Sequence, residues 1–416
     1  MPYNTINNDI QLLKYLIIII LFLPKYLQAW ELSGYVGVES LGFLVAPLND
    51  QQHTHYLSGV IQPELIHQWD NSQQQFAFEP FYRYSQFDNR RTHFDIRELN
   101  WLKISDNWEL RIGISRVFWG STESEHLVDI VNQTDLVEDL NMEAKLGQPM
   151  VNLTLIREWG NLSMFLLPGF RERTFSGSEG RFNSSPSLDV ANTQFGGQGI
   201  AKELSFATRW SKSLGNWDWG LSGFHGISRE PSVLYVPSIT GLKIVPQYPK
   251  IQQVGLDLQV VQENLIWKLE SIVRSGQGPT YNASVGGLEY GLYSIFDSNV
   301  DLGLVTEYMY DTRGTRPIKI DFEELTKSHQ LIVFQNDFTT GIRIGLNDTH
   351  NSEAFIGGTF DVTTSEKFYT MNVKRRLIDN IQMHVEVKFL NNKVINDATY
   401  FLRGDNYIRT DLNYLF

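Results

Sequence analysis

The chain has 416 residues, with 42% hydrophobic, 13% aromatic and 20% charged residues and no cysteine. The absence of cysteine excludes a disulfide scaffold and a cysteine-based zinc site. A formal net charge of −12 argues against a nucleic-acid partner, because nothing basic enough to follow a phosphate backbone is present.

The first 29 residues have the pattern of an export signal. Lys14 precedes the uninterrupted apolar block 16–23, and Leu27-Gln28-Ala29 offers a cleavage site. The block is shorter than the about 20 residues that a membrane helix needs. We therefore predict two parts, a signal peptide over 1–29 and a β-barrel over 30–416, although a buried helix or a short N-terminal anchor would fit the apolar block too.

Period-two alternation of apolar and polar residues dominates the rest of the chain. In 381–389, for example, Ile381, Met383 and Val385 alternate with Gln382 and His384. This is the pattern of strands with one apolar face. It predicts eighteen strands, near 32–45, 56–69, 74–86, 92–104, 108–119, 149–158, 162–171, 203–212, 217–229, 251–262, 264–274, 283–296, 299–312, 337–348, 352–363, 366–377, 381–391 and 405–416.

The connections between these strands alternate in length. Every second one is a tight turn built on Asn, Asp or Gly, as at Asp70-Asn71, Gly215-Asn216 and Asp379-Asn380. The others are mostly longer, notably near 120–148, 172–202, 230–250 and 313–336. Short turns at one rim and long loops at the other predict an all-β, transmembrane, antiparallel up-and-down barrel of 16–18 strands, with periplasmic turns and extracellular loops.

The C-terminus supports the same fold. Ile408, Thr410, Leu412, Tyr414 and the terminal Phe416 share one face of the last strand. A final alternating strand that ends on an aromatic residue is typical of bacterial outer-membrane proteins and is recognised by their assembly machinery. We therefore expect outer-membrane lipid and the barrel-assembly machinery as partners. The sequence leaves open whether copies of the chain associate into a homo-oligomer.

The segment after Trp119 is unusually acidic. Its apolar residues, including Leu127, Val131 and Leu140, have a helix-like spacing that would allow a short amphipathic piece. Three interpretations stay open: a solvated surface loop, a loop that narrows the lumen, or a divalent-cation site. The candidate residues for a pore constriction are Glu123, Glu125, Asp129, Asn132 and Asp135.

The same region resembles a family of porin-like proteobacterial outer-membrane proteins of unknown function. The residues that carry the resemblance are Trp119, Gly120, Asp129, Asn132, Asp135, Pro149 and Met150. It is sharpest over about 110–155, and Gln133 stands where the family pattern has Pro. The resemblance implies the barrel architecture and is compatible with transport, without naming a solute.

Charged residues on the polar faces of the strands are expected to line the lumen. Basic and acidic residues are nearly balanced among them, unlike the basic ladder of a polyanion conduit. The lumen-lining candidates are Glu109, Arg111, Lys268, Glu270, Asp301, Glu307, Lys374, Arg376, Glu386, Lys388, Arg409 and Asp411.

No motif for nucleophilic, zinc-dependent or nucleotide chemistry is present, so we expect neither an enzyme nor a cofactor nor a metal. The function predicted from the sequence is a porin-like channel for small hydrophilic solutes. A plugged receptor, adhesin or structural barrel is the first alternative, and a transporter of apolar molecules the second, which the charged lumen candidates disfavour. A barrel lipase would need a lipid-facing Ser and His close together.

Overall fold

Residues 30–183, 188–196, 203–239, 241–314, 327–330, 332–392 and 399–416 are described by the structure, a computed structural model. The predicted signal peptide therefore lies outside the described residues. Among the described residues, no helix is long and apolar enough to cross a membrane.

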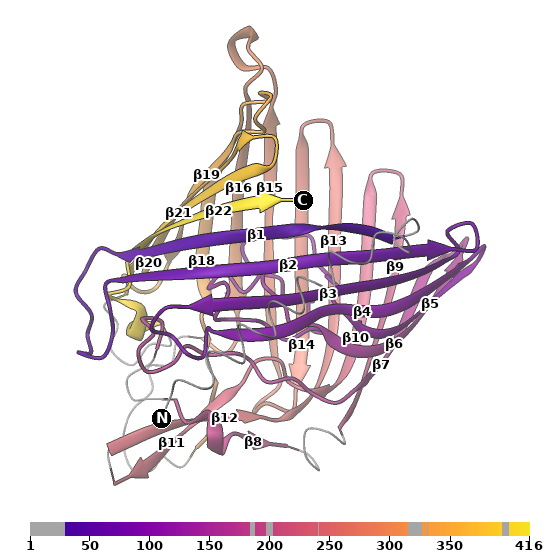
Figure 1. The fold of residues 1–416 in the computed structure, drawn as a ribbon. Coiled ribbons are helices and arrows are strands. Elements are labelled where there is room, and N and C mark those ends of the chain that lie inside the picture. The colour runs from indigo at the N-terminus through magenta and orange to yellow at the C-terminus, as the bar shows by residue number, and fades with distance from the viewer. Residues whose placement is uncertain are drawn as a thin grey trace.

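Eighteen antiparallel strands form one closed sheet, which confirms the predicted barrel (Figure 1). The strands are β1 (Trp30–Phe43), β2 (His55–Trp69), β3 (Gln74–Ser85), β4 (His93–Ser105), β5 (Trp108–Ser115), β6 (Gln148–Arg157), β7 (Gly160–Pro168), β9 (Leu204–Leu214), β10 (Trp217–Ile227), β13 (Lys250–Gln262), β14 (Leu265–Ser275), β15 (Tyr281–Leu292), β16 (Asp301–Asp311), β18 (Asn336–Gly345), β19 (Glu353–Asp361), β20 (Lys367–Ile378), β21 (Ile381–Asn391) and β22 (Tyr407–Leu415).

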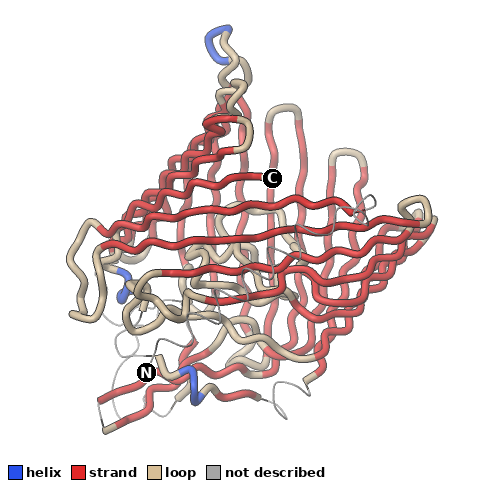
Figure 2. The backbone as a smooth tube through the Cα atoms, in the orientation of Figure 1, coloured by secondary structure: helices blue, strands red, loops and turns tan. Residues whose placement is uncertain are grey.

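The first and last strands close the barrel. β1 pairs with β22 from Tyr35 opposite Leu415 to Phe43 opposite Tyr407, and the terminal Phe416 exchanges backbone hydrogen bonds with Gly34. Closure satisfies the backbone of both edge strands, which hydrocarbon could not solvate. Most of the short connections lie at one end of the barrel, here called the turn end, and the longest ones lie at the other, here called the loop end (Figure 2).

The outward face of the barrel is apolar. Large hydrophobic side chains at alternating positions are exposed there, as Ile408, Leu412 and Tyr414 are on β22, while Tyr407 points inward and is buried. Trp217 and Trp267, close to the turn end, are also outward and exposed, where an interfacial aromatic belt belongs. This is the face that lipid would cover.

The long connections are more structured than the sequence predicts. A separate sheet in the order β17-β11-β12-β8 stands at the loop end (Figure 1). Its strands are β8 (Gln194–Phe195), β11 (Ser232–Ser238), β12 (Gly241–Tyr248) and β17 (His329–Gln330). Three short 3-10 helices, η2 (Val190–Asn192), η4 (Ile295–Asp297) and η6 (Tyr400–Leu402), complete the described elements.

Candidate functional site: a plug inside the barrel

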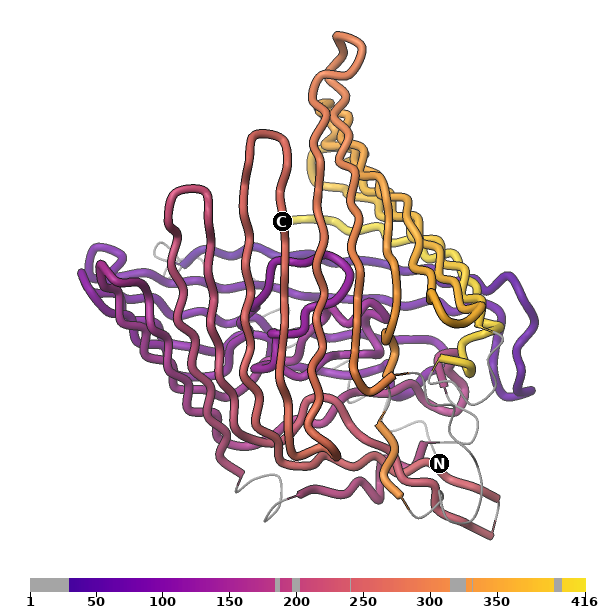
Figure 3. The backbone as a smooth tube through the Cα atoms, turned by 180° about the vertical axis from the view of Figure 1, so that it is seen from behind, coloured from indigo at the N-terminus to yellow at the C-terminus, as the bar shows by residue number. Residues whose placement is uncertain are grey.

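The connection between β5 and β6, residues 116–147, folds into the interior of the barrel; we call it the plug. Its trace is visible in purple through the barrel wall in Figure 3. The sequence predicts strand up to Trp119 and allows a short amphipathic helix after it. Both expectations are wrong: β5 ends at Ser115, and the plug contains turns and an isolated bridge but no helix. Its backbone groups form hydrogen bonds within the plug, as from Asp135 to Ala144 and from Leu146 to Gln133, and with side chains of the plug and of the barrel wall.

The first half of the plug is held by two wall carboxylates. The carboxylate of Glu270 on β14 accepts hydrogen bonds from the backbone N–H of Ser121 (2.8 Å), Thr122 (3.1 Å) and Val128 (3.1 Å) and from the Thr122 hydroxyl (2.6 Å). The carboxylate of Glu307 on β16 accepts hydrogen bonds from the backbone N–H groups of Glu123 (2.9 Å) and Ser124 (2.8 Å). Hydrogen bonds to an ionised acceptor are about twice as strong as neutral ones, so these two residues fix the backbone path.

The second half of the plug is held by wall cations. Asp135 lies 2.6 Å from the guanidinium of Arg97 on β4, and Glu138 lies 2.7 Å from that of Arg83 on β3. Asn141, further on, accepts a hydrogen bond from the ammonium of Lys388 on β21. Asp135 and Glu138 thus have basic partners on the wall.

These contacts lie on opposite sides of the barrel. Counted round the closed sheet from β1, β4 is the fourth strand and β16 the thirteenth of eighteen. They are therefore half a circumference apart. The plug spans the lumen instead of following one wall.

Packed apolar side chains fill one side of the lumen. Val128, Ile130 and Val131 of the plug are nearly inaccessible to solvent and belong to one cluster with inward-facing wall residues. The wall contributes Met150, Phe165, Leu167, Ala207, Phe224, Ile251, Ile272, Tyr281 and Ala283. A core of this kind is what a globular domain has, and it excludes water from that part of the barrel.

The structure brings the five constriction candidates into this plug, where most serve as anchors. Asn132 bonds to the backbone of Ser115, Val117 and Leu146. Asp129 pairs with Lys145 at 3.1 Å, and Glu123 pairs with Lys268 at 2.6 Å and Arg343 at 2.9 Å. The interpretation as a solvated surface loop does not fit this placement.

All four acidic candidates have shifted pKa values, and those of Glu125 and Asp135 move in opposite directions. Burial raises the pKa of Asp135, but the nearby imidazole of His93 and the charge of Arg97 outweigh it and hold this pKa at about 2. Glu125 lacks such partners, and burial, with the nearby charges of Glu230 and Glu270, raises its pKa to about 7. Asp135 is thus an ionised anchor, whereas Glu125 titrates near neutral pH.

The lumen-lining candidates fall into three groups. The first contacts the plug: Lys268, Glu270, Glu307, Glu386 and Lys388. The second group, Arg409 and Asp411, forms ion pairs within the wall. The guanidinium of Arg409 lies 3.3 Å from the carboxylate of Asp411 and also 3.3 Å from that of Glu386. The third makes no ion pair within the described chain: Glu109, Arg111, Lys374, Arg376 and Asp301, the last of which accepts hydrogen bonds at a turn.

Arg97, the partner of Asp135, is absent from the lumen-lining residues that alternation predicts. The pairing of β3 with β4 shifts register between Glu79 and Pro80, opposite Glu98 and Ile96, so Arg97 has no partner in the ladder. A bulge of this kind reverses the alternation of faces along the strand. Pro80, which cannot donate a ladder hydrogen bond, is the signal that could have revealed it.

Comparisons with known proteins place this architecture in a class. No family model and no curated protein sequence matches the chain. Solved structures of outer-membrane β-barrels do match, so the fold is that of a bacterial outer-membrane β-barrel. Wzi of Escherichia coli is matched over 92% of this chain and 84% of its own, with 8% identity and a TM-score of 0.52. It is described as an outer-membrane protein involved in group 1 capsule assembly and as a carbohydrate-binding β-barrel.

Two further outer-membrane protein structures match less well. OmpT of Vibrio cholerae has 9% identity and a TM-score of 0.44, over 93% of this chain and 99% of its own. A porin of Rh. blastica has 8% identity and a TM-score of 0.43, over 93% and 100%.

Proposed function

We propose that the protein is a closed outer-membrane barrel that binds a polar polymer, a carbohydrate, at its loop end. The observation that carries the proposal is the plug, which binds β3 and β4 on one side and β14 and β16 on the other. A barrel of 16–18 strands has room for an aqueous channel only where its lumen is not filled. This function corresponds to the plugged receptor among the alternatives that the sequence leaves open.

A second layer supports closure at the loop end. Arg181, in the connection after β7, lies 2.9 Å from Asp405 in the connection before β22, and both are buried. Gln52, between β1 and β2, donates to the backbone carbonyl of Gly180 at 2.9 Å. Three long connections are therefore tied together across the mouth of the barrel.

The surface of this layer suits a polar ligand. Asn49 and Gln51 of this layer, and Asn89 of the connection between β3 and β4, are exposed, and their amide groups both donate and accept hydrogen bonds as sugar hydroxyls do. The description of Wzi as carbohydrate-binding agrees with this ligand class.

The remaining parts of the proposal concern export and assembly. Residues 1–29 act as a signal peptide cleaved near Ala29, and the loop end then faces the cell exterior. The barrel-assembly machinery recognises the final strand ending at Phe416. The proposal assigns no catalytic step.

The experiment combines transport with binding. Proteoliposomes carrying the purified protein are tested for swelling in a panel of sugars, amino acids and anions, and intact cells expressing it are tested for retention of purified capsular polysaccharides. We expect no swelling above protein-free liposomes and retention of at least one polysaccharide. Swelling at the rate of a general porin, or no retention of any polysaccharide, would contradict the proposal.

A porin-like channel for small hydrophilic solutes is the second candidate. It is favoured by Lys374, which is inward by alternation and yet exposed, and by the Arg343 side chain, which is 43% exposed. Water therefore reaches part of the lumen along β18–β20. Rapid swelling with small solutes alone would support this candidate.

A further inference from the structure

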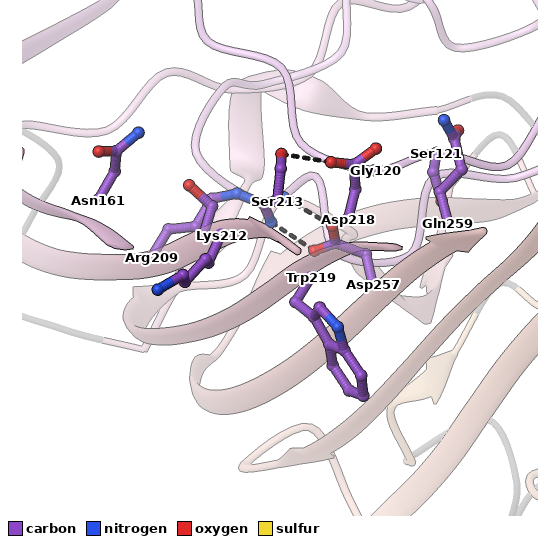
Figure 4. A pocket seen from close by; sticks show the side chains of 11 residues that line it. Gly120, Ser121, Asn161, Arg209, Lys212, Ser213, Asp218, Trp219, Asp257 and Gln259 are labelled. Carbon is purple, nitrogen blue, oxygen red and sulfur yellow. Dashed lines mark hydrogen bonds and ion pairs between the residues drawn. The ribbon is translucent and has the colours of Figure 1, made fainter. Parts of the chain in front are cut away.

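A cavity of about 250 Å³ lies on the turn side of the plug (Figure 4). Gly120 and Ser121, at the start of the plug, form one side of it. The other side is the barrel wall, where β7, β9, β10 and β13 contribute Asn161, Ser211, Asp218 and Gln259 among others. The site needs both the wall and the plug to be complete.

The charged groups of the cavity neutralise one another. Arg209 forms a bidentate ion pair with Asp257, with 2.6 Å between Nη2 and Oδ2. The hydroxyl of Ser213 donates to Asp218, and the ammonium of Lys212 donates to the backbone carbonyl of Glu158 at 2.6 Å. Arg209 and Lys212 balance Asp218 and Asp257, so the cavity carries no formal net charge.

Neutral polar groups remain available in the same cavity. The Ser121 hydroxyl has no hydrogen-bond partner within the described chain, but it has almost no accessible surface, so a ligand in the cavity does not reach it. Asn161, Ser211 and Gln259 likewise make no side-chain hydrogen bond with described residues. Their amide and hydroxyl groups can pair with the hydroxyl groups of a ligand in the cavity.

We propose that this cavity binds one neutral, polyhydroxylated molecule, a single saccharide unit, on the periplasmic side of the plug. Hydroxyl and amide groups match sugar hydroxyls, which donate and accept at once, and the balanced charges give an anion no advantage. The volume lies below the about 300–1,000 Å³ of typical ligand pockets, which limits the ligand to one ring. No aromatic platform contributes, because the Trp219 indole points away from the polar side chains (Figure 4). The site goes beyond the proposed function, since it lies on the opposite side of the plug from the loop end.

The test is a calorimetric titration of the purified full-length protein in detergent with glucose, N-acetylglucosamine, glucuronate and inorganic phosphate. We expect saturable binding of a neutral sugar and at least tenfold weaker binding of glucuronate and phosphate. Removing one neutral hydrogen bond weakens binding by about fivefold, so N161A should have an effect of that size. S211L and Q259L place apolar bulk in the cavity and should abolish binding.

The matched control is S271L, since Ser271 lies on the outward face between Leu269 and Val273, which are exposed. It should bind the sugar like the natural protein, and heat-modifiable migration shows which variants are folded. The proposal is overturned if no neutral sugar binds, if anions bind more tightly, or if N161A, S211L and Q259L all bind normally. Polysaccharide retention by intact cells should be the same in S211L as in the natural protein, which separates this site from the loop-end function.

Discussion

The two halves of the plug are attached to the barrel by opposite arrangements of charge. In the first half, 120–128, the wall supplies the carboxylates Glu270 and Glu307, and the plug supplies backbone N–H groups. In the second half, 134–141, the wall supplies Arg83 and Arg97, and the plug supplies carboxylates. Backbone N–H groups make most of the hydrogen bonds of the first attachment, and the side chains of Thr122 and Glu123 add to them. The second attachment depends on side-chain carboxylates directly. Side-chain changes within the plug should therefore matter most in its second half.

The largest effect is expected from Arg97→Ala. It leaves Asp135 buried with its main counter-ion removed, and breaking a buried ion pair on one side costs about 3–5 kcal/mol. Urea unfolding in detergent, followed by tryptophan fluorescence, measures the loss.

Two variants control this prediction. The double variant Arg97→Ala with Asp135→Asn should recover much of the loss, because no buried charge is then left alone. Arg375→Ala removes a half-exposed pair with Asp348 at the turn end and should cost less than about 1 kcal/mol. Equal losses in Arg97→Ala and Arg375→Ala would show that the second attachment is weak.

Glu270→Ala tests the first attachment. It removes the acceptor of four hydrogen bonds at once, and we expect a loss of about 3 kcal/mol in the free energy of unfolding. Glu270→Gln keeps one acceptor oxygen and should lose less. If Glu270→Ala and Glu270→Gln were equally stable, hydrogen bonds from the plug to this carboxylate would not be what holds the plug.

The pH dependence of stability should depend on Glu125. Its pKa rises from 4.5 to about 7 in the folded protein, so between these values the folded state keeps a proton that the unfolded state has released. The contribution of Glu125 is therefore largest below pH 4.5 and is lost as the pH rises towards 7. Relative to Glu125→Gln, the natural protein should lose about 2 kcal/mol between pH 4 and pH 8. Parallel pH profiles of the two proteins would contradict this assignment.

The smallest effect on final stability is expected from deleting Phe416. Its backbone pairs with Gly34 at the closure of the barrel, and it ends the strand that assembly is proposed to recognise. We expect slower appearance of the heat-modifiable barrel in cells and a nearly unchanged urea midpoint. Normal assembly kinetics would remove the proposed role of the last residue.

Local patterns predicted the barrel because strands, turns and faces are local properties. The predicted strand 381–391 is β21 as observed, and Glu270 and Glu307 were placed on the inward face by alternation alone. The path of the plug could not be predicted in this way. It depends on pairs distant in sequence, such as Thr122 with Glu270, and on the bulge that turns Arg97 inward. The outer sheet was missed for the same reason, since β8 and β17 contain two residues each and pair with β12 and β11 only in the folded chain.

Single-channel conductance in planar bilayers is the most direct test of a closed lumen. The natural protein should show no discrete porin-sized steps, and a variant in which residues 121–144 are replaced by a short Gly-Ser linker should show them. Steps of the same size in both proteins would mean that the plug does not close the barrel.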